Sequence, residues 1–272
     1  MHHHRRFSLS GYVATRGLAI TLLLNGTLMF FPCAQAAVPD AEKGTVWGLG
    51  VGVTSAEKPY VDVDRDTSVL PLLHVENSYF KFFATTFEAK LPTITFSDTN
   101  TLHVGIIGRW DGAGYESGDS WMLDGMEKRK GGLWAGGKIA WQIRLVNMSA
   151  DWTHDVSGNS KGQQFSLGLD RSWQIGDHFS ITPRLGATWY DSKYVDYYYG
   201  VRAHEARAWR PDYNGTSGVS AEAGLQGVYR LNSHHSFIVD AQMSRFSSDI
   251  KDSPLVDRSG SNRFSLGYIY YF

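Results

Sequence analysis

The sequence of 272 residues contains one cysteine, Cys33, and no cysteine after it. A single cysteine excludes an internal disulfide framework, and its position near the start excludes thiol catalysis in the rest of the chain. Basic residues are not in excess either, since 26 Lys and Arg stand beside 27 Asp and Glu. This balance offers no basic surface for phosphates, and we therefore expect no nucleic-acid partner.

Long apolar runs are missing as well. The run near the start of the chain, Leu18 to Phe31, has about 14 residues, whereas a membrane-spanning helix needs about 20. No later run approaches that length. A helical membrane protein is therefore not expected, although an N-terminal anchor formed by this run stays open as an alternative to a signal peptide.

The residues around this run are typical of a secretory signal peptide. The preceding segment has no acidic residue, and its basic residues are Arg5, Arg6 and Arg16. The motif Ala34-Gln35-Ala36 then offers a cleavage site of small residues. We therefore expect residues 1–36 to be removed, Cys33 included, and the exported chain to comprise residues 37–272.

Glycine and aromatic residues are abundant, with 29 glycines and 14% Phe, Trp and Tyr. In the segment VWGLGVGV (46–53), Gly48, Gly50 and Gly52 alternate with larger residues. A strand in lipid turns an apolar side chain outward at every second position, and small residues suit the inward face of a narrow barrel. The spacing G-x-G-x-G without a following helix does not fit a nucleotide-binding loop. The segment therefore predicts the first strand of an outer-membrane barrel.

The same alternation recurs in segments of about ten residues, which is long enough to cross about 25 Å of hydrocarbon when tilted. The residues predicted to face lipid are Leu102, Val104, Ile106 and Trp110; Ile181, Leu185, Ala187 and Trp189; Val219, Ala221, Ala223, Leu225 and Tyr229; and Phe264, Leu266, Tyr268, Tyr270 and Phe272. We therefore predict an all-β fold, a transmembrane antiparallel up-and-down β-barrel in the outer membrane of a Gram-negative cell.

The lengths of the connections predict strand number and orientation, because barrels of this type have long external and short periplasmic links. The long links are 54–66, 111–130, 191–217 and 247–261, and the short ones lie near 76–78, 97–100, 142–144, 174–178 and 231–235. Tyr79–Phe96 must then hold two strands with a tight external turn near Thr85 to Glu88. We expect about 12 strands with both termini in the periplasm, or about 10 if that region is irregular.

Two local signals complete this topology. Proline cannot donate to a ladder, so bulges or strand ends are expected at Pro71, Pro92 and Pro183. The chain ends on Phe272, with Tyr270 and Tyr268 at alternate positions before it. This ending matches the signal that the outer-membrane barrel assembly machinery reads, and we expect that machinery and outer-membrane lipid as partners; an ordinary terminal strand is the alternative.

Several motifs in the exported chain point to a family. They are GLGVGV in the first strand, LPLLHVENSYFKF (70–82), DYYYGV (196–201), RFSSDIKDSPLVD (245–257) and the aromatic tail. Together they resemble the MltA-interacting protein/OmpV family of Gram-negative outer-membrane proteins over nearly the whole exported chain. The motif residues that fall in links are Tyr197, Tyr198, Tyr199, Gly200, Val201, Asp252, Ser253, Pro254 and Asp257.

This resemblance implies a barrel without established enzymatic activity, so we expect it not to be an enzyme, and we expect no cofactor. The founding member is regarded as a scaffold that joins a membrane-bound lytic transglycosylase to a murein synthase, so that wall cutting and wall building are coupled. Other members are described as porin-like proteins, adhesins or osmotic and antibiotic-response proteins. We therefore expect a scaffold for peptidoglycan remodelling, with a narrow solute channel, a porin-like protein or a surface adhesin as alternatives.

Charged residues on the predicted inward faces are the best functional candidates. They are Arg109, Lys138, Arg184, Glu222, Arg230, Asp240 and Arg263. Buried charges must pair or contact water, so these residues either brace a closed lumen or line a small aqueous pore. A closed or loop-plugged lumen is the interpretation that we favour.

Other polar and aromatic groups have simpler interpretations. His154-Asp155, with Asp111 and Asp119 as imagined partners, resembles the site of barrel proteases in residue type only, and a polar loop tip is expected. His234-His235 lacks further metal ligands nearby and is expected to be a solvated turn, so no metal site is predicted. Trp189 and Tyr194 are assigned to the aromatic girdle, whereas Tyr197–Val201 is expected in a loop that folds inward.

Overall fold

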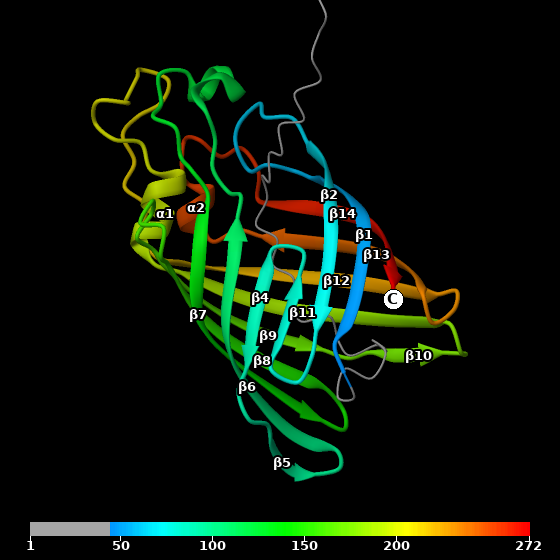
Figure 1. Cartoon of the computed structure of the whole chain (residues 1–272). Coiled ribbons are helices and arrows are strands. Elements are labelled where there is room, and N and C mark those ends of the chain that lie inside the picture. Colours follow the sequence, from blue (N-terminus) through cyan, green and yellow to red (C-terminus); the bar gives the residue numbers. More distant parts are fainter. Residues whose placement is uncertain (1–43) are drawn as a thin grey trace, which may run out of the picture.

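The computed structural model of the chain describes residues 44–272, so the expected signal peptide at residues 1–36 lies outside the described residues. The described part is mainly antiparallel sheet, with short helices gathered at one end (Figure 1). Its strands are β1 (Val46–Ala56), β2 (Asp66–Glu76), β3 (Phe80–Phe83), β4 (Thr86–Lys90), β5 (Ile94–Ser97), β6 (Asn100–Asp111), β7 (Gly132–Ile143), β8 (Asn147–Asp155), β9 (Gln163–Asp170), β10 (Trp173–Ile175), β11 (Phe179–Tyr190), β12 (Gly218–Arg230), β13 (His235–Arg245) and β14 (Gly260–Tyr271). Its helices are η1 (Ser117–Asp119), η2 (Trp121–Leu123), α1 (Ser192–Tyr199) and α2 (Ser248–Lys251). Within residues 44–272, no helix is long and apolar enough to cross a membrane.

Twelve of the strands in the described part form a closed ring. The ring runs in the order β1-β2-β3-β4-β6-β7-β8-β9-β11-β12-β13-β14, and β14 pairs back onto β1 to close it. The strands β5 and β10 lie outside the ring, because β5 pairs with β6 and β10 pairs with β11 at the end opposite the long links. The predicted twelve-stranded antiparallel barrel is confirmed.

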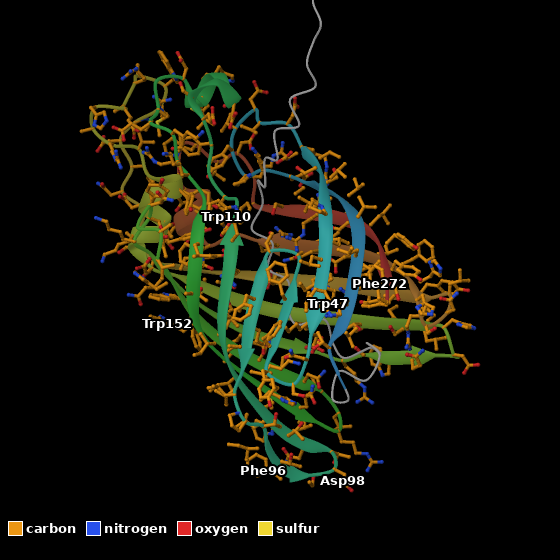
Figure 2. The ribbon with its side chains drawn as sticks, in the orientation of Figure 1. Trp47, Phe96, Asp98, Trp110, Trp152 and Phe272 are labelled. Carbon is orange, nitrogen blue, oxygen red and sulfur yellow. The ribbon has the colours of Figure 1, made fainter. Side chains whose placement is uncertain are left out.

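Large apolar side chains point outward around the ring, as the alternation predicts. On β1, Trp47, Leu49 and Val51 are each about half exposed, whereas the glycines between them face the lumen. Trp110 on β6 and Trp152 on β8 lie on the same outer surface (Figure 2). An apolar face that continues around a closed sheet is suited to lipid.

The inward glycines of β1 leave room for the last strand. A Cβ atom added to Gly50 would lie 1.9 Å from the carbonyl oxygen of Tyr268 and 2.9 Å from the Cα atom of Ile269. At Gly48 the added atom would meet the side chains of Ile269 and Tyr271. Those two side chains are buried inside the barrel, so the glycine face of β1 allows the first and last strands to close the ring.

The β3–β4 hairpin is shorter than expected. Its turn lies at Ala84 and Thr85, where Ala84 has a φ of 53°. The hairpin ends level with His74 of β2 and Arg109 of β6, through the pairs His74↔Phe83 and Thr86↔Arg109. The turn expected at the external end of the barrel therefore lies within the height of the wall. Above the turn, neither β3 nor β4 continues between β2 and β6, and we call the gap that this leaves beside β2 the notch.

Pro71 lies beside the notch, within an unbroken β2. The carbonyl oxygen of Leu73 accepts a hydrogen bond of 3.0 Å from the N–H of Ala84, so Leu73 turns its backbone polar groups toward the hairpin. Pro71, two residues away, turns the same way. Pro71 therefore lacks its N–H on a side where the hairpin offers no acceptor, so no ladder bond is lost. The expected bulge or strand end is wrong here, because β2 keeps its register with β1.

The other two prolines lie at ladder breaks. Pro183 stands inside β11, and its carbonyl oxygen accepts from the N–H of Arg171 at the junction between β9 and β10. Pro183 therefore lies where the partner of β11 changes from β9 to β10, and its lack of an N–H costs no ladder bond there. Because β11 continues through Pro183 in register with β12, the expected bulge or strand end is wrong. Pro92 lies between β4 and β5, as predicted for a strand end.

Candidate functional site in the lumen and its cap

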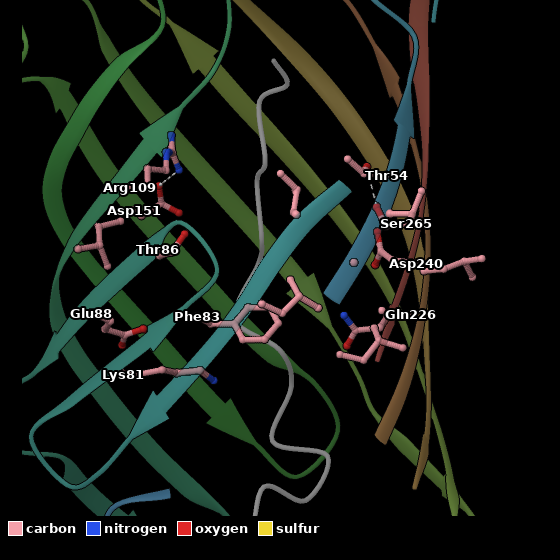
Figure 3. A pocket seen from close by; sticks show the side chains of 18 of the residues that line it. Thr54, Lys81, Phe83, Thr86, Glu88, Arg109, Asp151, Gln226, Asp240 and Ser265 are labelled. Atoms are coloured by element: carbon pink, nitrogen blue, oxygen red, sulfur yellow. Dashed lines mark hydrogen bonds and ion pairs between the residues drawn. The ribbon is translucent and has the colours of Figure 1, made fainter. Parts of the chain in front are cut away.

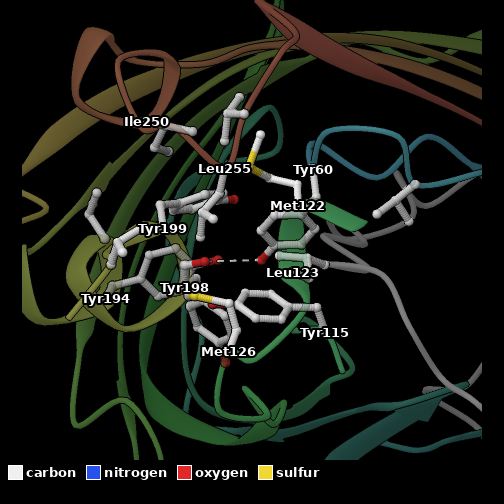
Figure 4. Close-up of a cluster of buried hydrophobic side chains, with 14 of the residues drawn as sticks. Tyr60, Tyr115, Met122, Leu123, Met126, Tyr194, Tyr198, Tyr199, Ile250 and Leu255 are labelled. Carbon is white, nitrogen blue, oxygen red and sulfur yellow. Dashed lines mark hydrogen bonds between the residues drawn. The ribbon is translucent and has the colours of Figure 1, made fainter. Parts of the chain in front are cut away.

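The external links pack together over one end of the barrel. We call residues 57–65, 112–131, 191–217 and 246–259 the cap. Its buried side chains form one apolar cluster, which includes Tyr60, Leu123, Val195, Tyr198 and Leu255 (Figure 4). A cavity of about 150 Å³ lies beneath it, with cap residues and inward wall residues in its lining, so the cap forms the roof of the lumen.

Helix α1 brings the first family motif into the cap. The side chain of Asp191 accepts a hydrogen bond of 2.9 Å from the N–H of Tyr194 and so begins the helix, which ends before Gly200. Tyr194 is only 3% exposed, so its assignment to the membrane girdle is wrong; Trp189, which points outward, fits that assignment. The segment Tyr197–Val201 folds inward as expected, but mostly as a helix rather than a loop.

The two family motifs contact each other inside the cap. The hydroxyl of Ser253 donates a hydrogen bond of 2.6 Å to the carbonyl oxygen of Tyr199. The hydroxyl of Tyr60 donates to the carbonyl oxygen of Tyr198 at 3.3 Å. Burial and neighbouring tyrosines raise the pKa of Tyr60 well above its ordinary value, so this donor keeps its proton. Asp252 and Asp257 remain exposed beside the half-buried Pro254.

A buried ion pair ties two links of the cap. Arg129 donates to both carboxylate oxygens of Glu205, at 3.0 and 2.8 Å, and both side chains are almost fully buried. Burial opposes ionisation of Glu205, but hydrogen bonds from the N–H of Glu127, the guanidinium of Arg129 and the N–H of Arg202 hold its pKa below the ordinary value. The pair thus joins the link at 112–131 to the link at 191–217.

Cross-strand ion pairs occupy the inward face of the wall. Arg184 of β11 donates to both oxygens of Asp240 of β13, at 2.6 and 2.8 Å. Lys138 of β7 donates to Glu88 of β4 at 2.7 Å. Each pair reaches across the strand that lies between its members. These contacts place three of the predicted charges inside the barrel.

Three more of the predicted charges belong to hydrogen-bonded groups. Arg109 donates to Gln164 at 2.6 Å, and its nearest acidic oxygen belongs to Asp151, at 3.9 Å (Figure 3). Gln242 of β13 joins the other two, because it donates to Glu222 and accepts from Arg263.

Arg230 is the exception among the predicted lumen charges, since it lies at the periplasmic end of β12. At the same end, a network around Glu76 was missed in the sequence. His74 lies 3.1 Å from Glu76, and Lys90 donates to Glu76 at 2.6 Å. Lys81 is 3.4 Å from the same carboxylate. These residues come from β2, β3 and β4, and they meet only because the β3–β4 hairpin is short. The sequence alone did not give the register of that hairpin, so it did not predict the network.

A cavity of about 110 Å³ lies inside the lumen. Its wall is mainly apolar on the side of β2 and the hairpin, where Leu70, Leu72 and Phe83 line it. Arg109 and Asp151 contribute polar atoms on another side (Figure 3). The structure thus has a roofed lumen with a partly open chamber beside the notch.

The remaining candidates have structural roles. The carboxylate of Asp155 accepts from the backbone of the turn 156–162 and from two serine hydroxyls there, so it organises the turn instead of facing a substrate. Asp119 accepts from the N–H of Glu116 at the start of η1. His234 and His235 contact the aromatic tail, where His235 lies 2.7 Å from the hydroxyl of Tyr268, and this differs from a merely solvated turn.

Comparison with known proteins identifies the family. The family model described as "MltA-interacting protein MipA" matches residues 49–272. The chain belongs to the MltA-interacting protein family. The MltA-interacting protein of Escherichia coli K12 is 28% identical over 256 residues, covering 93% of this chain and 99% of the relative. YiaT of the same strain is 28% identical over 253 residues, covering 88% and 97%.

Other members carry names that give a location. Outer membrane protein OmpV of Vibrio cholerae is 25% identical over 213 residues, covering 77% of this chain and 80% of the relative. Among solved structures, an outer membrane channel from Pseudomonas putida F1 is 14% identical, covers 89% of this chain and 99% of its own, and has a TM-score of 0.48. Since the chain forms a closed barrel and its relatives are named as interacting or outer-membrane proteins, it is an outer-membrane barrel protein.

Proposed function

We propose that this barrel is a non-enzymatic scaffold that holds a lytic transglycosylase, and with it a murein synthase, at the inner face of the outer membrane. The name of the Escherichia coli relative supports the first partner, because that protein is called MltA-interacting and aligns over nearly the whole chain. A roofed lumen with paired charges supports a role other than free diffusion of solutes.

The observation that carries the proposal is a pair of projections at the periplasmic end. All four residues of β5 and all three residues of β10 are exposed, so neither strand is covered on either face. Phe96 is 62% exposed and lies near the tip of the first projection, beside Asp98 (Figure 2). Trp173 and Ile175 are about half exposed on the second.

Each projection also has one strand edge without a partner among residues 44–272. Apolar side chains beside a free edge suit docking by strand addition, in which main-chain hydrogen bonds give affinity and side-chain pockets give specificity. Two such projections on one barrel provide two places for enzymes, and the scaffold would keep both near the cell wall.

Site-directed photocrosslinking in cells tests the proposal. A photoreactive amino acid replaces Phe96 in one strain and Leu266 in another; both side chains are 62% exposed, but Leu266 faces lipid in the wall. We expect a lytic transglycosylase to be recovered from the Phe96 position and not from the Leu266 position. The Phe96→Ser variant should lose co-purification while remaining folded. Recovery of no wall enzyme from either projection would refute the scaffold role.

A further inference from the structure

At the notch, part of one side of β2 has no backbone partner among residues 44–272. The ladder to β3 covers His74, Val75 and Glu76, and one further bond joins Ala84 to Leu73. Beyond these, Thr67, Val69 and Pro71, which turn the same way as Leu73, make no backbone hydrogen bond on this side to any part of the described chain. In contrast, the other side of β2 pairs with β1 along its full length.

This free edge lies at the height of the lipid-facing belt. Val69 is level with Val53 of β1 and, across it, with Leu266 of β14, and all three side chains are exposed on the outer surface. Open sheet edges do not occur against hydrocarbon, because unpaired N–H and C=O groups there cost several kcal/mol each; they are tolerated where they line a wet cavity. Pro71 also removes one donor from the edge and so discourages the addition of a further strand.

The chamber of about 110 Å³ lies directly behind the notch. Residues of both borders line it: Leu70 and Leu72 from β2, Phe83 and Thr86 from the hairpin on either side of its turn, and Ile107 from β6. An apolar cavity of about 150 Å³ in another protein accepts benzene. The size of this chamber therefore suits one small ring or a short alkyl group.

A polar group stands at one side of the chamber. The side chain of Arg109 is more than nine-tenths buried, and its Nε atom has no hydrogen-bond partner in the described part of the chain. The nearest carboxylate oxygen, from Asp151, lies 3.9 Å from a different nitrogen of Arg109. A buried donor without a partner is costly, and an anionic ligand would satisfy it.

We infer that the chamber is a binding site for a small amphiphile, an aromatic or short-chain carboxylic acid, which enters from the outer leaflet through the notch. The apolar part lies against Leu70, Leu72 and Ile107, and the carboxylate accepts from Arg109. The cap lies over the external end of the barrel and the network around Glu76 lies at the periplasmic end, so the notch offers a lateral route that does not require an open pore. This inference is independent of the scaffold role, because the site lies in the wall and not on the projections.

Binding is tested with 4-fluorobenzoate and ¹⁹F NMR on the barrel in phosphatidylcholine nanodiscs, with empty nanodiscs as the blank. We expect saturable line broadening that Leu70→Trp weakens at least about tenfold, a change of about 1.4 kcal/mol in binding. Val69→Trp, the neighbouring lipid-facing position, should leave binding unchanged. Arg109→Gln should weaken 4-fluorobenzoate but not fluorobenzene, which has no carboxylate. If Leu70→Trp does not fold, Ile107→Phe fills the chamber from the opposite border.

The route is tested with single cysteines in the otherwise cysteine-free barrel. Leu72→Cys lies beside the notch, whereas Thr182→Cys, equally buried, lies inside the wall of β11 away from the chamber. Membrane-soluble N-phenylmaleimide should label Leu72→Cys faster than Thr182→Cys, and a charged maleimide should not show this preference. No saturable broadening beyond the blank, equal binding by Leu70→Trp, or equal labelling of the two cysteines would overturn the inference.

Discussion

Arg184 and Asp240 form a two-point ion pair that crosses β12 inside the barrel, with N···O distances of 2.6 and 2.8 Å. Gly224 of β12 lies beneath this pair, and a Cβ atom there would come within 2.7 Å of the Arg184 guanidinium. Three consecutive strands of the ring therefore supply complementary residues: a cation on β11, a glycine on β12 that leaves room for its side chain, and an anion on β13.

Removal of one member of this pair should destabilise the barrel more than removal of both. Asp240→Leu leaves Arg184 buried without its counter-ion, which we expect to cost about 3 kcal/mol of the free energy of unfolding. The double variant Arg184→Met/Asp240→Leu should recover most of that loss. Urea unfolding of the four proteins in lipid vesicles measures the coupling, and additive effects of the two substitutions would contradict the pairing.

Gly50→Ala should impair closure of the ring. The added methyl group meets backbone atoms of β14, which cannot move aside without breaking the β1–β14 ladder, and we expect a cost of at least about 2 kcal/mol. Gly137→Ala is the matched control, because nothing lies within 4 Å of its added Cβ atom. The folded fraction can be read from the heat-dependent mobility shift on gels. Equal folded fractions for the two variants would show that the close approach at Gly50 is unimportant.

The wall of the barrel was predictable because lipid imposes a simple rule on sequence. Every second side chain must be apolar, so the outward positions of β1, β11, β12 and β14 could be assigned without knowing their neighbours. The hairpin was harder, since its length depends on how far β3 pairs with β2 and β4 pairs with β6. The sequence has no pattern that indicates the φ of 53° at Ala84 or the side of β2 to which Pro71 turns.

The cap should loosen in acid. The pKa of Glu205 is held below its ordinary value, so the folded cap binds fewer protons than an opened one. This contribution to stability is present above the ordinary glutamate pKa of about 4.3 and is lost as the pH falls through the lower pKa of the closed cap. Protease cleavage within 191–217 should accelerate below about pH 4. Glu205→Gln should be cleaved faster at neutral pH, with little further change in acid; a wild-type rate that is constant down to pH 3 would exclude this role.

Phe272 should matter for assembly more than for stability. Its side chain is 72% exposed, and its N–H donates to the carbonyl oxygen of Trp47 in any variant that keeps the backbone. Phe272→Ser should therefore change the free energy of unfolding by less than about 0.5 kcal/mol. In cells, the amount of assembled barrel should fall severalfold, while Leu231→Ser, an exposed residue of a neighbouring turn, should have no effect. Normal assembly of Phe272→Ser would remove the terminal residue from the assembly signal.

The candidate site was predictable only in part, because the residues that contact each other there are far apart in the sequence. The inward charges followed from the alternation, but their partners did not, because Glu88 and Lys138 are brought together by the ring and not by the sequence. In the cap, Tyr194 has the composition of a girdle residue, and contacts with distant links bury it instead. Contacts between links do not repeat at a regular spacing in the sequence, as the alternation of the strands does, so they could not be predicted from it.

The central claim is that the cap and the paired charges close this barrel to ion flow along its axis. Planar-bilayer recording with purified protein, verified as folded by its gel shift, tests that claim most directly. We predict a silent membrane at neutral pH over the usual range of voltages. Stable, reproducible conductance steps from the folded wild-type protein would contradict the account and favour a solute channel.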